Sequence, residues 1–191
     1  MSKHNYLLTE EFHRSYVQND FENNEHVMPH LTLFMEDSAL VLPIKIPDDA
    51  MKRMFDLIAR KMVHETKASA YLFISEAWFI VRNDGKCDVR PMDADDRQEC
   101  LLYNVGIDGQ EHNFRYVVNR DAHGNPSLGE ASQNYGVVSD TVTRFMTNLT
   151  DMGPYERAPD EVKLHIDAIV TNFLNQHAQR EKDRKSNKII H

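Results

Sequence analysis

An acidic residue, Glu76, lies within the most apolar stretch of the chain, AYLFISEAWFIV at residues 70–81, which only Ser75 and Glu76 interrupt. Burying a carboxylate is costly unless it gains a cationic or hydrogen-bonding partner or keeps its proton through a raised pKa. Carboxylates perturbed in this way are candidate acids or bases of functional sites. The alternative interpretation is a structural carboxylate bridged to an arginine or to a backbone group. Glu76 is therefore a candidate catalytic residue.

Two arginines, Arg90 and Arg97, follow in the polar connection at 82–98 and are candidate partners of Glu76. A second apolar segment at 99–108 is expected to pair with the strand at 70–81, which would bring Arg97 within reach of Glu76. In one interpretation this ion pair only sets the register of the two strands. In the other, Glu76 belongs to an acid site whose arginines, Arg90 and Arg97, bind an anionic ligand through charge-assisted hydrogen bonds.

His30 and Thr32 form a second candidate pair, in the tetrapeptide His30-Leu31-Thr32-Leu33. This His-x-Thr-hydrophobic form is similar to the motif of the two-histidine phosphoesterases. On a strand the two side chains share a face, where an imidazole and a hydroxyl could hold one phosphate. That family uses a second such motif, and the other His-x-Thr, at 64–66, is followed by Lys67 instead of a hydrophobic residue. The sequence thus carries half of the signature.

The sequence predicts no metal site and no cofactor. His26 and His30 have the four-residue spacing of metal ligands on a helix, but Pro29 and the strand that follows argue against a helix there. The two cysteines, Cys87 and Cys100, are thirteen residues apart and form no metal-binding pair, and Cys100 is expected in the core. Their number gives no reason to expect an oxidising compartment.

The elements that position these residues follow from periodicity and turn chemistry. Strands are expected at 30–35, 39–46, 70–81, 99–108 and 111–120, and helices at 48–64, 135–149 and from 159 onward, with residues 121–134 as a loop. Pro43 places the second strand at an edge or a bulge, and Asp108-Gly109 predicts a tight hairpin. The order β-β-α-β-β-β-α-α indicates an α+β fold, a mostly antiparallel sheet of about five strands with helices packed on it.

The expected organisation is one central domain with additions at both ends. Residues 1–24 are an arm or short helix with Thr9 as its N-cap, ended by the asparagines of 19–24. Residues 25–150 form the α+β domain, and residues 151–191 form a C-terminal helix with a basic tail. Within the domain, 135–149 is ambiguous between strand and helix, and we favour the helix. Asp48 is the expected N-cap of the helix at 48–64.

Composition limits the class of protein. The 191 residues have 41% hydrophobic content and a formal net charge of -8. This is an ordinary globular mix that disfavours a broad nucleic-acid surface. Residues 180–188 hold five basic and two acidic side chains, which is either a solvated helix end or a contact for phosphate or an acidic partner. Neither a signal-peptide core nor a run of membrane-spanning length is found in the sequence. The expected location is the cytoplasm.

Two short motifs, Ser-Glu-Ala-Trp at 75–78 and Asp96-Arg97-x-Glu99 before the next strand, carry a resemblance. The region 28–120 resembles a loose group of uncharacterised small proteins from bacteriophages and prophages. In these proteins a strand ends in Ser-Glu-Ala-Trp and an Asp-Arg-x-Glu follows downstream. The resemblance implies a phage origin and a soluble accessory role in the host cytoplasm, and it implies no particular substrate.

The expected function is protein–protein interaction in an infected cell, with an unidentified protein or a second copy of the chain as partner. Neither a Gly-rich phosphate loop nor a nucleophile elbow is found in the sequence, so the balance leans away from an enzyme. The alternative is a phosphoesterase-like hydrolase, or a binder of a small anionic ligand, that uses His30 and Thr32 or Glu76 and Arg97.

Overall fold

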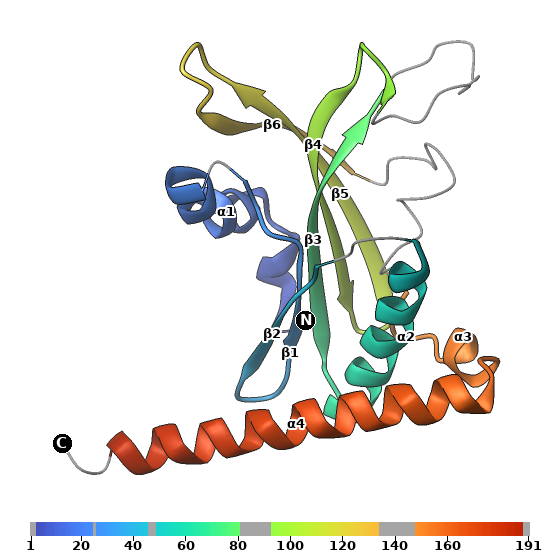
Figure 1. The fold of residues 1–191 in the computed structure, drawn as a ribbon. Coiled ribbons are helices and arrows are strands. Elements are labelled where there is room, and N and C mark those ends of the chain that lie inside the picture. The colour runs from blue at the N-terminus through green and yellow to red at the C-terminus, as the bar shows by residue number, and fades with distance from the viewer. Residues whose placement is uncertain (1–2, 25, 46–48, 81–92, 134–147, 189–191) are drawn as a thin grey trace.

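The computed structural model describes residues 3–24, 26–45, 49–80, 93–133 and 148–188 and shows an α+β fold built on one antiparallel sheet (Figure 1). Its helices are the short 3-10 helix η1 (Asn5–Leu8), α1 (Glu10–Asn24), α2 (Asp49–Thr66), α3 (Gly153–Glu156) and α4 (Asp160–Lys188). Its strands are β1 (His30–Phe34), β2 (Ala39–Pro43), β3 (Ala70–Phe79), β4 (Gln98–Ile107), β5 (Gln110–Arg120) and β6 (Pro126–Gln133), in the sheet order β2-β1-β3-β4-β5-β6. The predicted fold class is confirmed, with six strands instead of about five.

Strand β3 is an interior strand, as its aromatic and β-branched composition predicts. It pairs with β1 on one side and with β4 on the other, from Ala70 opposite Ile107 to Phe79 opposite Gln98. The β4–β5 hairpin turns at Asp108 and Gly109, whose φ angles are 52° and 76°. These positive values are those of the tight turn expected for Asp-Gly. Cys100, in β4, is buried as predicted.

The first two strands form the predicted hairpin and place β2 at the edge of the sheet. Strand β1 is antiparallel to both β2 and β3, so β2 and β3 run parallel with β1 between them. Helix α2 makes the connection between β2 and β3. Pro43, which cannot donate a ladder hydrogen bond, is the last residue of this edge strand, in agreement with the prediction.

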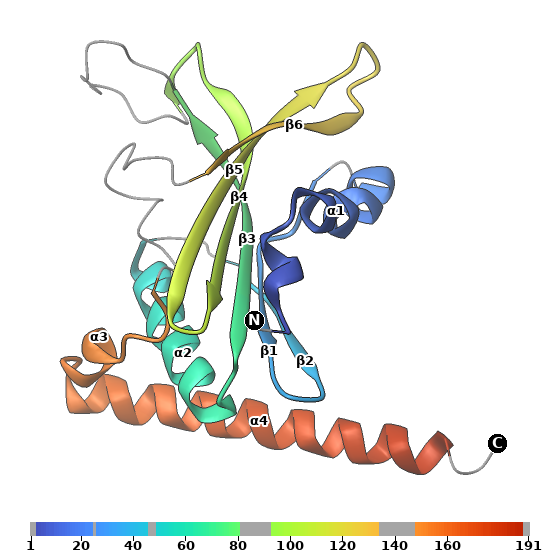
Figure 2. The same ribbon diagram turned by 180° about the vertical axis from the view of Figure 1, so that it is seen from behind.

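Helices cover the two faces of the sheet unequally (Figures 1 and 2). On one face η1 and α1 pack against β3, β4 and β5, where alternate residues such as Leu72, Tyr103 and Tyr116 are fully buried. On the other face α2 and α4 pack against β1, β2 and the first half of β3, with Phe73 and Ile166 in that second core. The first and last helices of the chain thus each contribute to a core.

Two predictions about local structure are wrong. Residues 121–134 were expected to be a loop, but Pro126–Gln133 form β6, because the free edge of β5 supplies a partner to a segment of low intrinsic preference. The asparagines at 19–24 do not end the first helix, which continues to Asn24. Thr9 caps that helix as predicted, and its hydroxyl accepts the Phe12 N–H at 3.2 Å. Asp48 and most of the ambiguous segment 135–149 lie outside the described residues.

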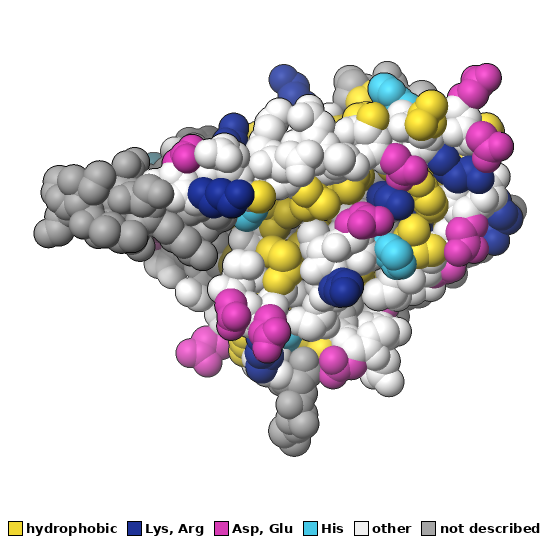
Figure 3. Space-filling view, turned by 90° about the horizontal axis from the view of Figure 1, so that it is seen from below, with side chains coloured by type: hydrophobic (Ala, Val, Ile, Leu, Met, Phe, Trp, Pro, Cys, Tyr) yellow, Lys and Arg dark blue, Asp and Glu magenta, His cyan; other side chains and the backbone are white. Residues whose placement is uncertain are grey.

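Helix α4 begins where a helix was expected and runs without a break through the basic segment to Lys188. It crosses one end of the molecule and continues past the edge strand β2 (Figures 1 and 2). On the face of the molecule that α4 crosses, hydrophobic side chains are exposed among charged ones (Figure 3). Leu164 of this helix is 74% exposed. Among the described residues, no helix is both long enough and apolar enough to cross a membrane.

One buried histidine, His13, joins α1 to the sheet. Its Nε2 donates to the Leu7 carbonyl at 2.7 Å. A neutral imidazole has one donor and one acceptor, so its Nδ1 accepts the Tyr116 hydroxyl proton, also at 2.7 Å. The Tyr103 hydroxyl donates to the His13 carbonyl at 3.0 Å. Burial, which disfavours the charged imidazolium, lowers the pKa of His13 to about 4.

We expect acid to weaken the fold through His13. Because its pKa is depressed in the folded state, the unfolded chain binds more protons between about pH 6.5 and pH 4, so stability is full above this window and falls through it. The loss approaches about 3 kcal/mol from this one group. Urea unfolding at several pH values should show this slope for the wild type and for His123→Gln, which changes an exposed histidine. The slope should flatten in His13→Gln, and an unchanged slope in that variant would contradict this assignment.

Candidate functional site

His30 and Thr32 lie on the same face of β1, as predicted, but helix α1 covers them. The Tyr16 hydroxyl lies 3.1 Å from His30 Nε2 and 3.2 Å from Thr32 Oγ1, and the Tyr16 and His30 rings stack. His30 Nδ1 donates to the Met28 carbonyl at 2.7 Å. Its Nε2 therefore accepts from Tyr16, which in turn accepts from Thr32. Every polar side-chain group of this trio has a partner inside the fold, and this arrangement favours a structural role.

Glu76 lies near the end of β3 with 25% of its side chain exposed, which is less burial than predicted. Its Oε1 accepts the backbone N–H of Val27 at 2.7 Å, and its Oε2 lies 3.2 Å from His26 Nδ1. The partner of Glu76 is therefore the segment after α1 and not Arg97. The sequence offered no signal for this pairing, because fifty residues separate His26 from Glu76.

Arg97 precedes β4, and the pairing of β3 with β4 does not bring it to Glu76 as predicted. The register places Glu76 opposite Leu101 and Trp78 opposite Glu99, so Arg97 is further along the same face. Its guanidinium lies over the Trp78 ring, 4.8 Å from the centroid, in a cation–π contact. The other predicted ligand-binding residue, Arg90, lies outside the described residues.

The strand register places Glu99 and Arg120 on the same face of the sheet as Glu76. The sequence did not single out these two residues as a pair. Arg120, the last residue of β5, donates two hydrogen bonds to the Glu99 carboxylate, from Nε to Oε2 at 2.9 Å and from Nη2 to Oε1 at 2.8 Å. One ligand atom from each of His26, Glu76 and Glu99 lies within 4.8 Å of the others. We call His26, Glu76, Glu99 and Arg120 the polar cluster. Alternation along the strands places Glu76 and Glu99 on one face, but only the three-dimensional fold adds His26.

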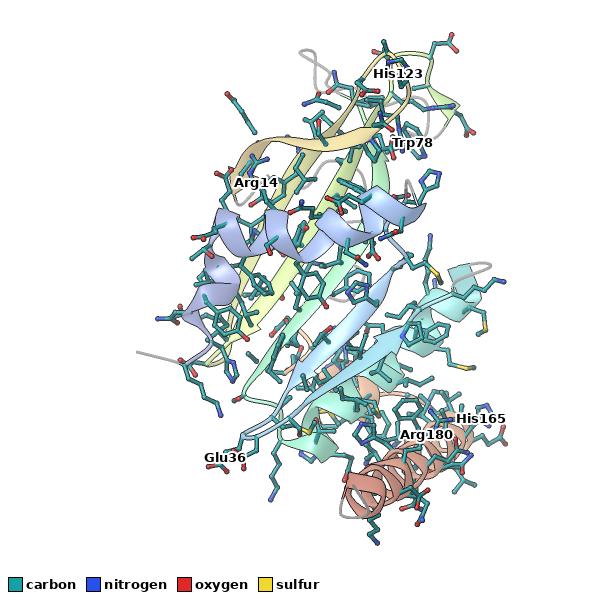
Figure 4. The ribbon with its side chains drawn as sticks, turned by 90° about the vertical axis from the view of Figure 1, so that its left-hand side faces the viewer. Arg14, Glu36, Trp78, His123, His165 and Arg180 are labelled. Carbon is teal, nitrogen blue, oxygen red and sulfur yellow. The ribbon has the colours of Figure 1, made fainter. Side chains whose placement is uncertain are left out.

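The polar cluster and Trp78 lie where α1 no longer covers the sheet. Figure 4 shows α1 lying across the strands, with Trp78 on the side of the helix nearer the β5–β6 turn that carries His123. Trp78 is 43% exposed, although it continues the face of β3 on which Leu72 and Ile74 are fully buried. The exposed end of this face is therefore suited to contact with a ligand or another molecule.

Strand β2 also presents an uncovered surface. Ala39, Val41 and Pro43 are exposed on the face that carries α1, and Val41 lies opposite Thr32, which contacts Tyr16 of α1. Met28, in the segment leading into β1, is 62% exposed. We call Met28, Ala39, Val41 and Pro43 the β2 ledge.

A groove of about 520 Å³ separates α1 from β6. Its walls include Val17 and Phe21 from the helix and Leu128 from the strand, and Arg14 closes it by donating to the Leu128 and Gly129 carbonyls at 2.6 and 2.7 Å. These two hydrogen bonds hold the edge strand β6 against α1. The groove is a packing feature of that contact.

No protein-family model matches the chain, and no curated protein and no solved structure matches it significantly.

We expect Tyr16→Phe to test the structural role of the trio. Removing the hydroxyl leaves His30 Nε2 and Thr32 Oγ1 without a partner at the α1–β1 contact, which should cost about 1–2 kcal/mol of the free energy of unfolding. In a double-mutant cycle with Thr32→Val the two changes should be non-additive, because the groups touch. Tyr6→Phe, at an exposed tyrosine, serves as the control and should change stability by less than about 0.5 kcal/mol. A Tyr16→Phe variant as stable as this control would contradict the assignment.

Proposed function

We propose that this protein acts by protein–protein interaction, and that strand β2 joins it to a second copy of the same chain. The observation that carries the proposal is an edge strand that is apolar, exposed and self-complementary. Exposed apolar surface on a sheet edge is a common site of association. The resemblance to small phage and prophage proteins supports a role inside the infected cell.

In the part of the chain that the structure describes, no strand pairs with the outer edge of β2. Ile44 N–H bonds to the Pro29 carbonyl, and Met35 N–H bonds to the Ser38 carbonyl. Hydrogen-bonded pairs alternate along an antiparallel ladder, so the even-numbered residues of β2 bond to β1. Ala39 and Val41 therefore direct their N–H and C=O groups away from the sheet, where a further strand could form hydrogen bonds with them.

A twofold axis at Val41 would pair three of these four groups in an antiparallel arrangement, and the Ala39 C=O, which lies opposite Pro43, gains no donor from the second copy. Val41 of each copy would exchange N–H and C=O bonds with Val41 of the other, and the Ala39 N–H would reach the Pro43 carbonyl of the second copy. Pro43 needs no acceptor, because it has no N–H. The same symmetry would place the two β2 ledges next to each other on one face of a continuous sheet.

Charge complementarity favours a second copy over an unrelated strand. All residues from Ala39 to Ile44 are uncharged, so no charged side chain blocks the edge. Asp37 and Lys45, both exposed, flank this stretch four residues on either side of Val41. In the twofold arrangement Asp37 of each copy would face Lys45 of the other, and opposite charges in cross-strand positions are favourable.

We expect the wild type to dimerise with increasing concentration and Val41→Lys to weaken the dimer by at least about tenfold, since it places two lysines opposite each other. Sedimentation velocity over a range of concentrations measures this. Leu164→Lys, at an exposed apolar residue of α4, should leave the dimer unchanged. A wild type that stays monomeric, or a Val41→Lys variant that dimerises as the wild type does, would overturn the proposal.

Charge reversal tests the register of the pairing. Asp37→Lys alone and Lys45→Asp alone should each weaken the dimer, because each places like charges together at two symmetry-related positions. The double variant restores opposite charges and should recover the wild-type dissociation constant in the same sedimentation assay. If the double variant weakens the dimer as much as the two single changes combined, the twofold axis does not pass through Val41.

A further inference from the structure

The polar cluster contains three possible metal ligands, and the proposed pairing through β2 uses none of them. His26 Nδ1 lies 3.2 Å from Glu76 Oε2, and one possible ligand atom from each of His26, Glu76 and Glu99 lies within 4.8 Å of the others. In a tetrahedral site with metal–ligand bonds of about 2.0–2.2 Å, neighbouring ligand atoms are roughly 3.4 Å apart. The three groups therefore need only small side-chain movements to share one ion.

Both carboxylates are already oriented by hydrogen bonds from outside the candidate donor set. The Val27 N–H holds Glu76 Oε1 at 2.7 Å and leaves Oε2 directed toward His26. Arg120 holds Glu99 at 2.8 and 2.9 Å, and each carboxylate oxygen keeps a second lone pair that can bind a metal. Ligating carboxylates in metalloproteins are held by outer hydrogen bonds of this kind.

Charge and exposure also suit a cation. Glu76 and Glu99 bring two negative charges to the cluster, and Arg120 supplies one positive charge bound to Glu99. A divalent ion would be attracted to these two carboxylates. The His26 side chain is 64% exposed, so solvent reaches the cluster and water could complete the coordination.

We propose that His26 Nδ1 and one oxygen each of Glu76 and Glu99 bind a divalent transition-metal ion, with water in the remaining positions. An imidazole with two carboxylates suits zinc and its first-row neighbours better than magnesium or calcium, which prefer oxygen ligands alone. Arg120 is a positioning residue for Glu99. This site shares no residue with the β2 ledge, and its proposed chemistry does not require self-association.

The test is calorimetric titration of the metal-stripped full-length chain with zinc chloride near pH 7. We expect one ion per chain, and His26→Ala and Glu76→Gln should each weaken binding by at least about tenfold. His64→Ala is the matched control, because His64 is also 64% exposed and lies 3.8 Å from a single carboxylate, that of Glu65. It should bind zinc as the wild type does, and so should Val41→Lys.

A second readout separates metal binding from a structural role of the cluster. Cobalt(II) in place of zinc should give a visible absorption spectrum whose intensity falls in Glu76→Gln and His26→Ala but not in His64→Ala. His26 is exposed, so its replacement tests the site even if a change at Glu76 disturbs the fold. Zinc binding that is weak and without a fixed stoichiometry, or that survives His26→Ala unchanged, would overturn the proposal.

Discussion

Helix α1 is held on the sheet by a buried hydrogen-bonded histidine. The position of the helix decides which parts of that face are exposed, namely the β2 ledge and the polar cluster. His13 binds the Leu7 carbonyl and the Tyr116 hydroxyl, and it fits only as the neutral ring. The same helix sends Tyr16 to His30 and Thr32 on β1. A charge on His13 would have to be buried between these partners, so the docking of the helix is coupled to pH.

The limited reach of this helix explains where polar and apolar groups are exposed. Helix α1 has 15 residues. At a rise of about 1.5 Å per residue it is roughly 22 Å long, and it covers β1 and the central strands but neither β2 nor the far ends of β3 to β5. Under the helix, alternate residues of β3 are apolar and buried. Beyond it the same row continues as Glu76 and Trp78, which are partly exposed. One face of one strand therefore serves first as core and then as surface.

The two uncovered regions have different chemistry and favour different partners. The β2 ledge is uncharged and has unused backbone groups, which suits another strand. The polar cluster has hydrogen-bonded carboxylates and an exposed imidazole, which suits a cation. The two regions share no residue, although Met28 of the β2 ledge follows His26 of the polar cluster by two residues. Self-association and metal binding are measured by separate assays.

The sequence by itself determined the class of fold, the interior position of β3 and the Asp-Gly hairpin, because these depend on local turn chemistry and on apolar composition. It limited the strand with Pro43 to an edge or a bulge, and the sheet order decided for the edge. It also placed His30 and Thr32 on one face, since alternation is a local property of a strand. Only the tertiary structure decided that Tyr16 covers them and that Glu76 binds His26 and Val27 instead of Arg97. Those contacts depend on strand register and on the path of the chain after α1, which join residues far apart in sequence and leave no local pattern. Strand β6 has the same explanation, because the open edge of β5 and not its own composition makes it a strand.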